Sequence, residues 1–195
     1  RYYYPQVHIL HPDLVVSNLT YSTPLIDGHL VTLSADITNI GLDNTFRSYQ
    51  VYFLVDDEVV GVRTMNPLPV NATCTASVTW IATPGEHVIK VIADGGYTIS
   101  ESNESNNEMF TTVYVPYSDL VVQELTWSPA MLNHSDEVIF TTVIGNTGEG
   151  ATERSFTVGI YLDGALFHSR IINGLAPGET VSVSCSWSAV YGAHN

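Results

Sequence analysis

Two similar units follow one another along the sequence, and this duplication limits the possible folds more than any other feature. Residues 12–16 (Pro-Asp-Leu-Val-Val) recur at 118–122 (Ser-Asp-Leu-Val-Val), a shift of 106 positions. Further matches in the same order, all shifted by 107 positions, join 38–41 to 145–148, 54–57 to 161–164, 68–71 to 175–178, and Trp80 to Trp187. The chain therefore contains two copies of one structural unit, and its fold class follows from what one copy forms.

Within each unit, short β-branched or alternating apolar runs are separated by turn residues, which is typical of β-strands. In the first unit this pattern predicts strands at 13–21, 29–40, 46–55, 58–65, 74–82, 86–93 and 108–115. Asp56-Asp57 and Asp163-Gly164 lie between apolar runs and predict hairpin turns. Seven short strands in about 104 residues is the number in an immunoglobulin-type sandwich. We therefore predict an all-β fold class of tandem seven-stranded immunoglobulin-like β-sandwiches.

The alignment of the two units also predicts the domain boundaries. His194 aligns with His87, and no residues follow that would align with the last two strands of the first unit. We expect the last strand of a preceding module, or a donor strand, in 1–11, a complete sandwich in 12–115, a linker in 116–118, and a sandwich without its last two strands in 119–195.

An incomplete sandwich exposes strand edges and part of its core, so we expect further strands to complete the second unit. Two sources are open at this point. Either the remainder of a longer chain supplies the strands, or a neighbouring subunit donates one, for which the segment 2–10 is a candidate. The expected partners are accordingly neighbouring modules or other copies of the chain.

The composition excludes several classes of function. The net charge is −14 with only six Lys and Arg, and these are scattered, whereas nucleic-acid binding requires clustered cations. The sequence holds no run of about 18 apolar residues, so we expect no membrane insertion in this segment. Signatures of nucleophile elbows, zinc proteases and phosphate-binding loops are also missing. We therefore expect a protein that is not an enzyme.

Four segments of the first unit together resemble the CARDB family, the cell adhesion related domain found in bacteria and common in archaeal surface proteins. They are Asp-Leu-Val-Val at 13–16, Thr-Asn-Ile-Gly at 38–41, Val-Tyr-Phe-Leu-Val-Asp-Asp at 51–57 and Glu-Ser-Asn-Glu-Ser-Asn-Asn at 101–107. The second unit repeats the second and third segments at 145–148 and 161–164. The resemblance implies seven-stranded sandwiches in large extracellular proteins, where they serve as spacers or binding accessories without catalytic activity.

We therefore expect a structural module of an extracellular surface protein, stalk or filament. The alternative is an adhesion or ligand-binding module that recognises glycan or protein. Asn-x-Ser/Thr triplets fit an extracellular location, and they make four residues candidates for N-linked glycans: Asn18, Asn71, Asn103 and Asn133. Asn18 lies on the first predicted strand, whereas the other three lie in predicted loops.

An acidic segment before the last strand of the first unit offers candidate ligands for calcium. Asp94, Glu101 and Glu104 carry the hard carboxylate oxygens that calcium prefers, although the spacing is not that of an EF-hand loop. The alternative is that the polar side chains of this segment cap turns through hydrogen bonds to the backbone. No other cofactor is expected.

The Trp and Cys residues of each unit lie on one face of a predicted strand. Cys74 shares a face with Trp80, and Cys185 shares a face with Trp187, because side chains alternate across a strand. We expect the two tryptophans to anchor separate cores. The two thiols are expected to remain unpaired because they lie in different units.

Overall fold

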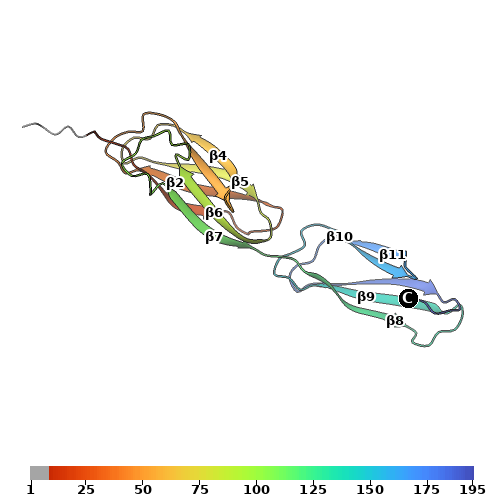
Figure 1. Ribbon diagram of the computed structural model, residues 1–195. Coiled ribbons are helices and arrows are strands. Elements are labelled where there is room, and N and C mark those ends of the chain that lie inside the picture. The colour runs from red at the N-terminus through yellow and green to blue at the C-terminus, as the bar shows by residue number, and fades with distance from the viewer. Residues whose placement is uncertain (1–8) are drawn as a thin grey trace, which may run out of the picture. The chain divides into compact units, whose positions relative to one another are not determined.

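The structure is a computed structural model that describes residues 9–195, and these residues form β-strands and loops (Figure 1). The chain divides into two compact units between Val115 and Pro116. No described residues form a helix that is long and apolar enough to cross a membrane.

The first unit is a seven-stranded sandwich. Its strands are β1 (Leu14–Tyr21), β2 (Leu30–Asn39), β3 (Tyr49–Val55), β4 (Glu58–Met65), β5 (Thr73–Ile81), β6 (Gly85–Ala93) and β7 (Glu108–Val115). One sheet has the order β1-β2-β5 and the other the order β4-β3-β6-β7, with all neighbours antiparallel. Alternate side chains of each strand point between the sheets, and the largest fully buried ones are Tyr49, Phe53, Leu14, Leu33 and Ile37. The predicted all-β sandwich is confirmed.

Turn chemistry determines where the strands reverse. Asp56 and Asp57 have φ angles of 52° and 65° and join β3 to β4 as the predicted hairpin. Asp163 and Gly164 do the same in the second unit, with φ angles of 52° and 79°. Positive φ at both central residues gives the turn the twist that antiparallel strands require.

One predicted strand boundary in the first unit is wrong by three residues. The pattern predicts a strand from 46, whereas β3 begins at Tyr49. Phe46 has a φ angle of 54° and an exposed ring, and Arg47 donates its backbone N–H to the carbonyl of Thr45. Residues 46–48 therefore form a loop, because a left-handed backbone conformation does not continue a strand.

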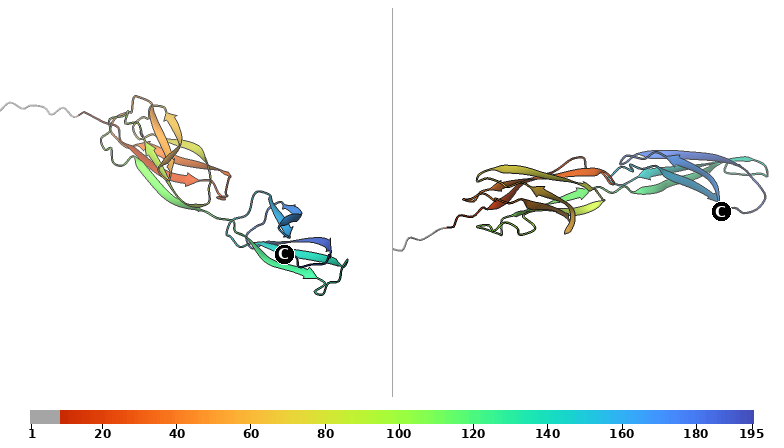
Figure 2. Two further views of the ribbon diagram at one scale, coloured as in Figure 1. Left: turned by 45° about the vertical axis from the view of Figure 1, so that its right-hand side comes forward. Right: turned by 90° about the horizontal axis from the view of Figure 1, so that it is seen from above.

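The second unit contains five strands. They are β8 (Leu120–Ser128), β9 (Glu137–Asn146), β10 (Phe156–Leu162), β11 (Ala165–Ile172) and β12 (Thr180–Ser188). One sheet has the order β12-β9-β8, and the hairpin β10-β11 forms a separate two-stranded sheet (Figure 2). These strands correspond to β1 to β5, and the described residues contain no counterpart of β6 or β7, as predicted. The buried core of this unit is small and comprises Ile144, Ile172, Leu175 and Val183.

The predicted strand at 2–10 falls mostly outside the described residues, which begin at Ile9. Ile9 and Leu10 are described, and neither belongs to a strand. Their side chains are 77% and 50% exposed, so these two residues do not pack as the end of a strand on the first unit.

Candidate functional site

The repeated Asn-x-Gly motif at the end of the second strand of each unit holds three loops together. In the first unit the Asn39 side chain is fully buried and makes four hydrogen bonds. Its Oδ1 accepts from the backbone N–H groups of Asp13 and Gly41, both at 3.1 Å. Its Nδ2 donates to the carbonyls of Asp43 at 2.8 Å and Leu68 at 3.1 Å. Both N–H donors and both lone pairs of the amide oxygen are therefore used in hydrogen bonds.

The second unit repeats this arrangement around Asn146. Its Oδ1 accepts from the backbone N–H groups of Asp119 at 2.9 Å and Gly148 at 3.1 Å. Its Nδ2 donates to the carbonyls of Gly150 at 2.7 Å and Leu175 at 3.1 Å. The glycine of the motif is required because a Cβ atom on Gly41 would lie 2.5 Å from the backbone of Asp13. The sequence shows this motif but not its role, because half of the bonded groups lie 26 to 29 residues away.

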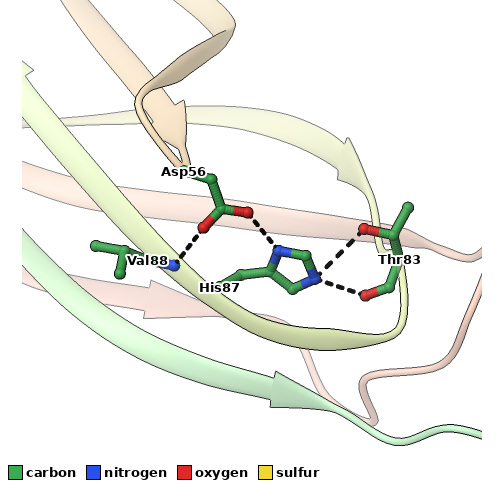
Figure 3. A network of polar contacts seen from close by, with 4 residues as sticks. All are labelled: Asp56, Thr83, His87 and Val88. Atoms are coloured by element: carbon green, nitrogen blue, oxygen red, sulfur yellow. Dashed lines mark hydrogen bonds and ion pairs between the residues drawn. The ribbon is translucent and has the colours of Figure 1, made fainter.

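A histidine–aspartate pair joins the β3-β4 turn to the start of β6 in the first unit (Figure 3). His87 Nδ1 lies 2.6 Å from Asp56 Oδ2, and the backbone N–H of Val88 donates to Asp56 Oδ1 at 2.9 Å. His87 Nε2 lies 2.7 Å from the carbonyl of Thr83. The hydrogen bond from His87, with that from Val88, holds the pKa of Asp56 below its usual value. The imidazole also meets the Trp80 ring edge-on, with centroids 5.1 Å apart.

The second unit contains the same pair in a more exposed setting. His194 Nδ1 lies 2.7 Å from Asp163 Oδ2, and the ring meets Trp187 edge-on at 4.9 Å. Asn195 donates its N–H to Asp163 Oδ1 at 2.9 Å and accepts from the Asp163 N–H at 2.6 Å. The hydrogen bond between the two side chains is the largest cause of a raised His194 pKa and a lowered Asp163 pKa. Asn195 thus occupies the position that Val88 occupies at the beginning of β6.

The acidic segment, residues 94–108, folds back onto the start of β1. Asp94 is buried, and its Oδ1 accepts from the N–H and hydroxyl of Thr98 at 3.1 and 2.7 Å, while its Oδ2 accepts from Ile99 N at 2.7 Å. Asn106 Nδ2 and Ser102 Oγ donate to the Asp13 carboxylate at 2.9 and 3.1 Å. This geometry is that of side chains that cap turns and fasten a loop.

Glu101 connects this acidic segment to the first strand. Its carboxylate is buried and accepts from the backbone N–H of Leu14 and from Asn107 Nδ2, the latter at 2.8 Å. Glu104 lies on the same segment, and its Oε1 accepts from the Glu101 N–H at 2.9 Å. Burial is the main cause that raises the pKa of Glu101 to about 7, and the negative charges of Glu104, Asp94 and Asp13 add to it.

The three calcium candidates are thus placed in one loop, but their oxygens bind protein donors. The residues that the structure describes include no group of three or more His, Cys, Asp or Glu side chains arranged to hold a metal ion. Two buried oxygens in the segment, Asn106 Oδ1 and Asn107 Oδ1, have no hydrogen-bond partner. Calcium binding stays a prediction.

All four asparagines of the Asn-x-Ser/Thr triplets are exposed. Asn71, Asn103 and Asn133 lie in loops. Asn18 lies at a bulge of β1 with a φ angle of 51°, and its Nδ2 donates to Asp36 Oδ2 at 2.9 Å. A glycan would be attached at this nitrogen, so modification of Asn18 would replace one of its N–H bonds, and glycan occupancy stays a prediction for all four sites.

The tryptophans of the two units differ in their surroundings. Trp80 is buried in the first core, whereas Trp187 is half-buried and lines a cavity. Cys74 and Cys185 are both unpaired and partly buried, and Cys74 Sγ lies 3.3 Å from the Tyr49 hydroxyl. Trp187 meets His194 as Trp80 meets His87, and the role of both tryptophans as core anchors stays a prediction.

The largely apolar cavity of the second unit has a volume of about 440 Å³. It opens between the sheet β12-β9-β8 and the hairpin β10-β11. Its lining residues are Leu125, Trp127, Leu132, Val138, Phe140, Ile160, Tyr161, Leu162, Phe167, Trp187, Gly192, His194 and Asn195. We refer to this cavity as the acceptor cleft. Sequence reasoning predicted an open core here but not which residues line it.

A known protein family matches the chain twice, once in each of its two units. The CARDB family model matches residues 11–111 and 117–194, which is most of the chain. The chain belongs to the CARDB family. The resemblance that the sequence motifs predicted is thereby confirmed, and each of the two units corresponds to one match.

Solved structures of single domains each match about half of the chain. A CARDB domain from Pyrococcus furiosus, determined in complex with di-metal ions, is 21% identical, with a TM-score of 0.48, over 56% of this chain and 93% of that chain. A domain of a candidate cell surface protein from Methanosarcina acetivorans is 30% identical, with a TM-score of 0.47, over 54% of this chain and 92% of that chain. No curated protein matches.

Proposed function

We propose that this chain is a non-catalytic structural segment of an extracellular surface protein, stalk or filament, in which tandem CARDB sandwiches act as spacers. The observation that carries the proposal is the use of the polar side chains. In the first unit, several polar side chains make two or more hydrogen bonds, and each of these fastens a loop or a strand end. They are Asn39, Asp56, Asp94 and Glu101. Catalytic groups, by contrast, converge on a space that a substrate can enter.

Microscopy of the native material, together with surface labelling of intact cells, tests this role. We expect ordered fibres or lattices in negative stain, and we expect the chain to be cleaved by protease added to unbroken cells. A chain that resists external protease until the cells are lysed, and that forms no ordered assembly, would contradict the proposal.

Adhesion or ligand binding is the second candidate function, and the acceptor cleft favours it. Trp127 and Trp187 line this cleft, and aromatic side chains are frequent in binding sites for glycans and proteins. Binding of the whole chain to a glycan array would support this function. Replacing Trp127 with Ala should then abolish binding to the array. Trp80 is not a suitable control, because its replacement would damage the buried core of the first unit.

We further propose N-linked glycans at the exposed triplets and calcium in the acidic segment. Intact mass before and after deglycosylation tests the glycans, since a mass that equals the bare polypeptide would end the claim. The unpartnered oxygens of Asn106 and Asn107 support a cation near Glu101. A chelator should then lower the melting temperature of the first unit, and an unchanged melting temperature counts against calcium.

A further inference from the structure

Four edge strands flank the two sheets of the first unit in the described part of the chain, namely β1, β5, β4 and β7. Three of them carry features that hinder pairing with another strand. β1 has a bulge at Asn18, and β4 has an irregular register with β3. Arg63 on β4 donates its Nε to the backbone carbonyl of Ser77 on β5 at 2.6 Å, which occupies an acceptor of that edge strand. Bulges and covered edges are common protections against strand addition.

The fourth edge strand, β7, is regular and largely apolar. It pairs with β6 in an unbroken register from Glu108 to Val115, and Glu108 is its only charged residue. The side chains of Met109, Phe110 and Tyr114 are 38%, 65% and 45% exposed. All seven strands of this sandwich are described, so the open edge belongs to a complete unit. A long, regular edge with exposed apolar side chains is a template for another strand.

The backbone groups in the middle of β7 point away from β6. Ala93 donates its N–H to the carbonyl of Asn107, so these two residues form a hydrogen-bonded pair of the antiparallel ladder. Such pairs alternate along a strand, and the N–H and C=O groups of Phe110 and Thr112 therefore face outward. No backbone hydrogen bond among the described residues engages these outward groups. They are available to a further strand.

A second copy of β7 matches this edge when the two strands run antiparallel about a two-fold axis at Thr112. Thr112 then lies opposite Thr112 of the second copy, and on each side of the axis Phe110 lies opposite Tyr114 of the other copy. All these positions are an even number of residues apart, so the paired residues share one face of the sheet and one hydrogen-bonding direction. Directly opposed aromatic side chains stabilise antiparallel sheets. An interface that meets its own copy is also the commonest way in which identical chains associate.

The charges beside this edge favour the same register. On β6, Lys90 lies beside Phe110, and Glu86 lies beside Tyr114. The two-fold arrangement therefore places Lys90 at one end of each aromatic pair and Glu86 of the other copy at the opposite end. A register shifted by two residues would instead place Glu108 of the second copy opposite Tyr114, with Glu86 on the other side of that ring. Because the chain carries a net charge of −14, its copies associate where like charges are kept apart.

We propose that β7 of the first unit is a self-association edge, at which two copies of the chain join their four-stranded sheets into one continuous antiparallel sheet. The pairing uses the outward backbone groups of Phe110 and Thr112 in each copy. It also covers the exposed ring of Phe110 with Tyr114 of the other copy. This interface goes beyond the role of a spacer, because it joins separate chains side by side, and it does not involve the second unit.

Sedimentation equilibrium of the whole chain between about 10 µM and 1 mM tests the association, and we expect a concentration-dependent equilibrium of monomer and dimer. Thr112→Pro should weaken the dimer at least about 10-fold. Proline removes the outward N–H at the two-fold axis, and it is tolerated on an edge strand where that N–H faces solvent. Thr112→Val is the matched control, because it keeps the N–H and a β-branched side chain, and it should dimerise as the unmodified chain does.

A pair of charge variants tests whether the partner is a second copy, and it does not depend on how the strand tolerates proline. Thr112→Lys and Thr112→Glu each place two like charges opposite one another at the axis, so each variant alone should dimerise at least about 10-fold more weakly. An equimolar mixture should restore dimers that contain one chain of each variant, because opposite charges then face one another.

Either of two results would overturn the proposal. The first is the mass of a single chain over the whole concentration range. The second is a dimer that all three variants, Thr112→Pro, Thr112→Lys and Thr112→Glu, form as strongly as the unmodified chain, which would assign the association to another surface, such as the acceptor cleft.

Discussion

At the scale of single residues, the structure depends on a few polar side chains that replace regular hydrogen bonds at strand ends. Asn39 is the clearest case, since one amide group bonds the loops before β1, after β2 and before β5. A buried amide, carbonyl or N–H that loses its partner destabilises a protein by about 1–3 kcal/mol. These residues therefore contribute to stability out of proportion to their number.

Replacement of Asn39 by Ala should lower the free energy of unfolding of the first unit by roughly 2–4 kcal/mol, because several buried backbone groups lose their partner at once. Urea unfolding measures this change. Asn44→Ala is the matched control, because the Asn44 side chain is exposed and makes one bond, to Val70 N at 3.0 Å. Its effect should stay below about 1 kcal/mol. Equal effects of the two variants would contradict this role for Asn39.

Glu101 makes the stability of the first unit depend on pH. Its pKa is about 7 in the folded protein against a usual 4.5, so the folded state binds the proton more tightly than the unfolded state. The stability of the first unit should therefore fall as pH rises from about 4.5 through about 7 and level off about one pH unit higher, once the carboxyl is ionised in the folded state as well. The total effect is roughly 3 kcal/mol at most.

Urea unfolding at a series of pH values checks this dependence with a Glu101→Gln variant. Gln keeps a similar size and stays uncharged, so the slope between pH 4.5 and 7 should largely disappear, and the variant should be the more stable protein at pH 8. A slope that is the same in both proteins would mean that Glu101 is not responsible.

At the scale of strands and turns, much of the first unit was predictable because its signals are local. The Asp56-Asp57 turn and the alternating pattern of β3 are both contained within a few neighbouring residues. The polar contacts were not predictable, because Glu101 bonds a backbone group 87 positions away and His87 bonds a carboxylate 31 positions away. Only the folded sheet order brings such groups together.

The two units provide an internal comparison for the packing of equivalent strands. Leu14→Ala should destabilise the first unit by about 2–5 kcal/mol, the usual range for a fully buried leucine. Leu120→Ala should destabilise the second unit by less than about 1.5 kcal/mol, because this side chain is 39% exposed and has no cover from the other sheet. Thermal unfolding of the two variants measures both effects, and equal losses would show that Leu120 is covered in solution.

At the scale of the whole molecule, the described residues form one complete CARDB sandwich followed by five strands of a second. The duplication predicted this division, since the alignment shows which strands lack a counterpart. The lining of the acceptor cleft, the unpaired edge of β10 and the position of Asn195 required the structure, because they depend on how strands that are distant in sequence pack together.

Residue-resolved hydrogen exchange of the unmodified chain tests this central claim most directly, because it reports the opening of each strand separately. We predict that amides of β2, β3 and β6 exchange only with global unfolding of the first unit. Amides on the outer edge of β10 should exchange at least about 100-fold faster than their equivalents in β3, since β10 pairs among the described residues with β11 alone, whereas β3 pairs with both β4 and β6. Equal protection of β10 and β3 in the chain alone would contradict the account.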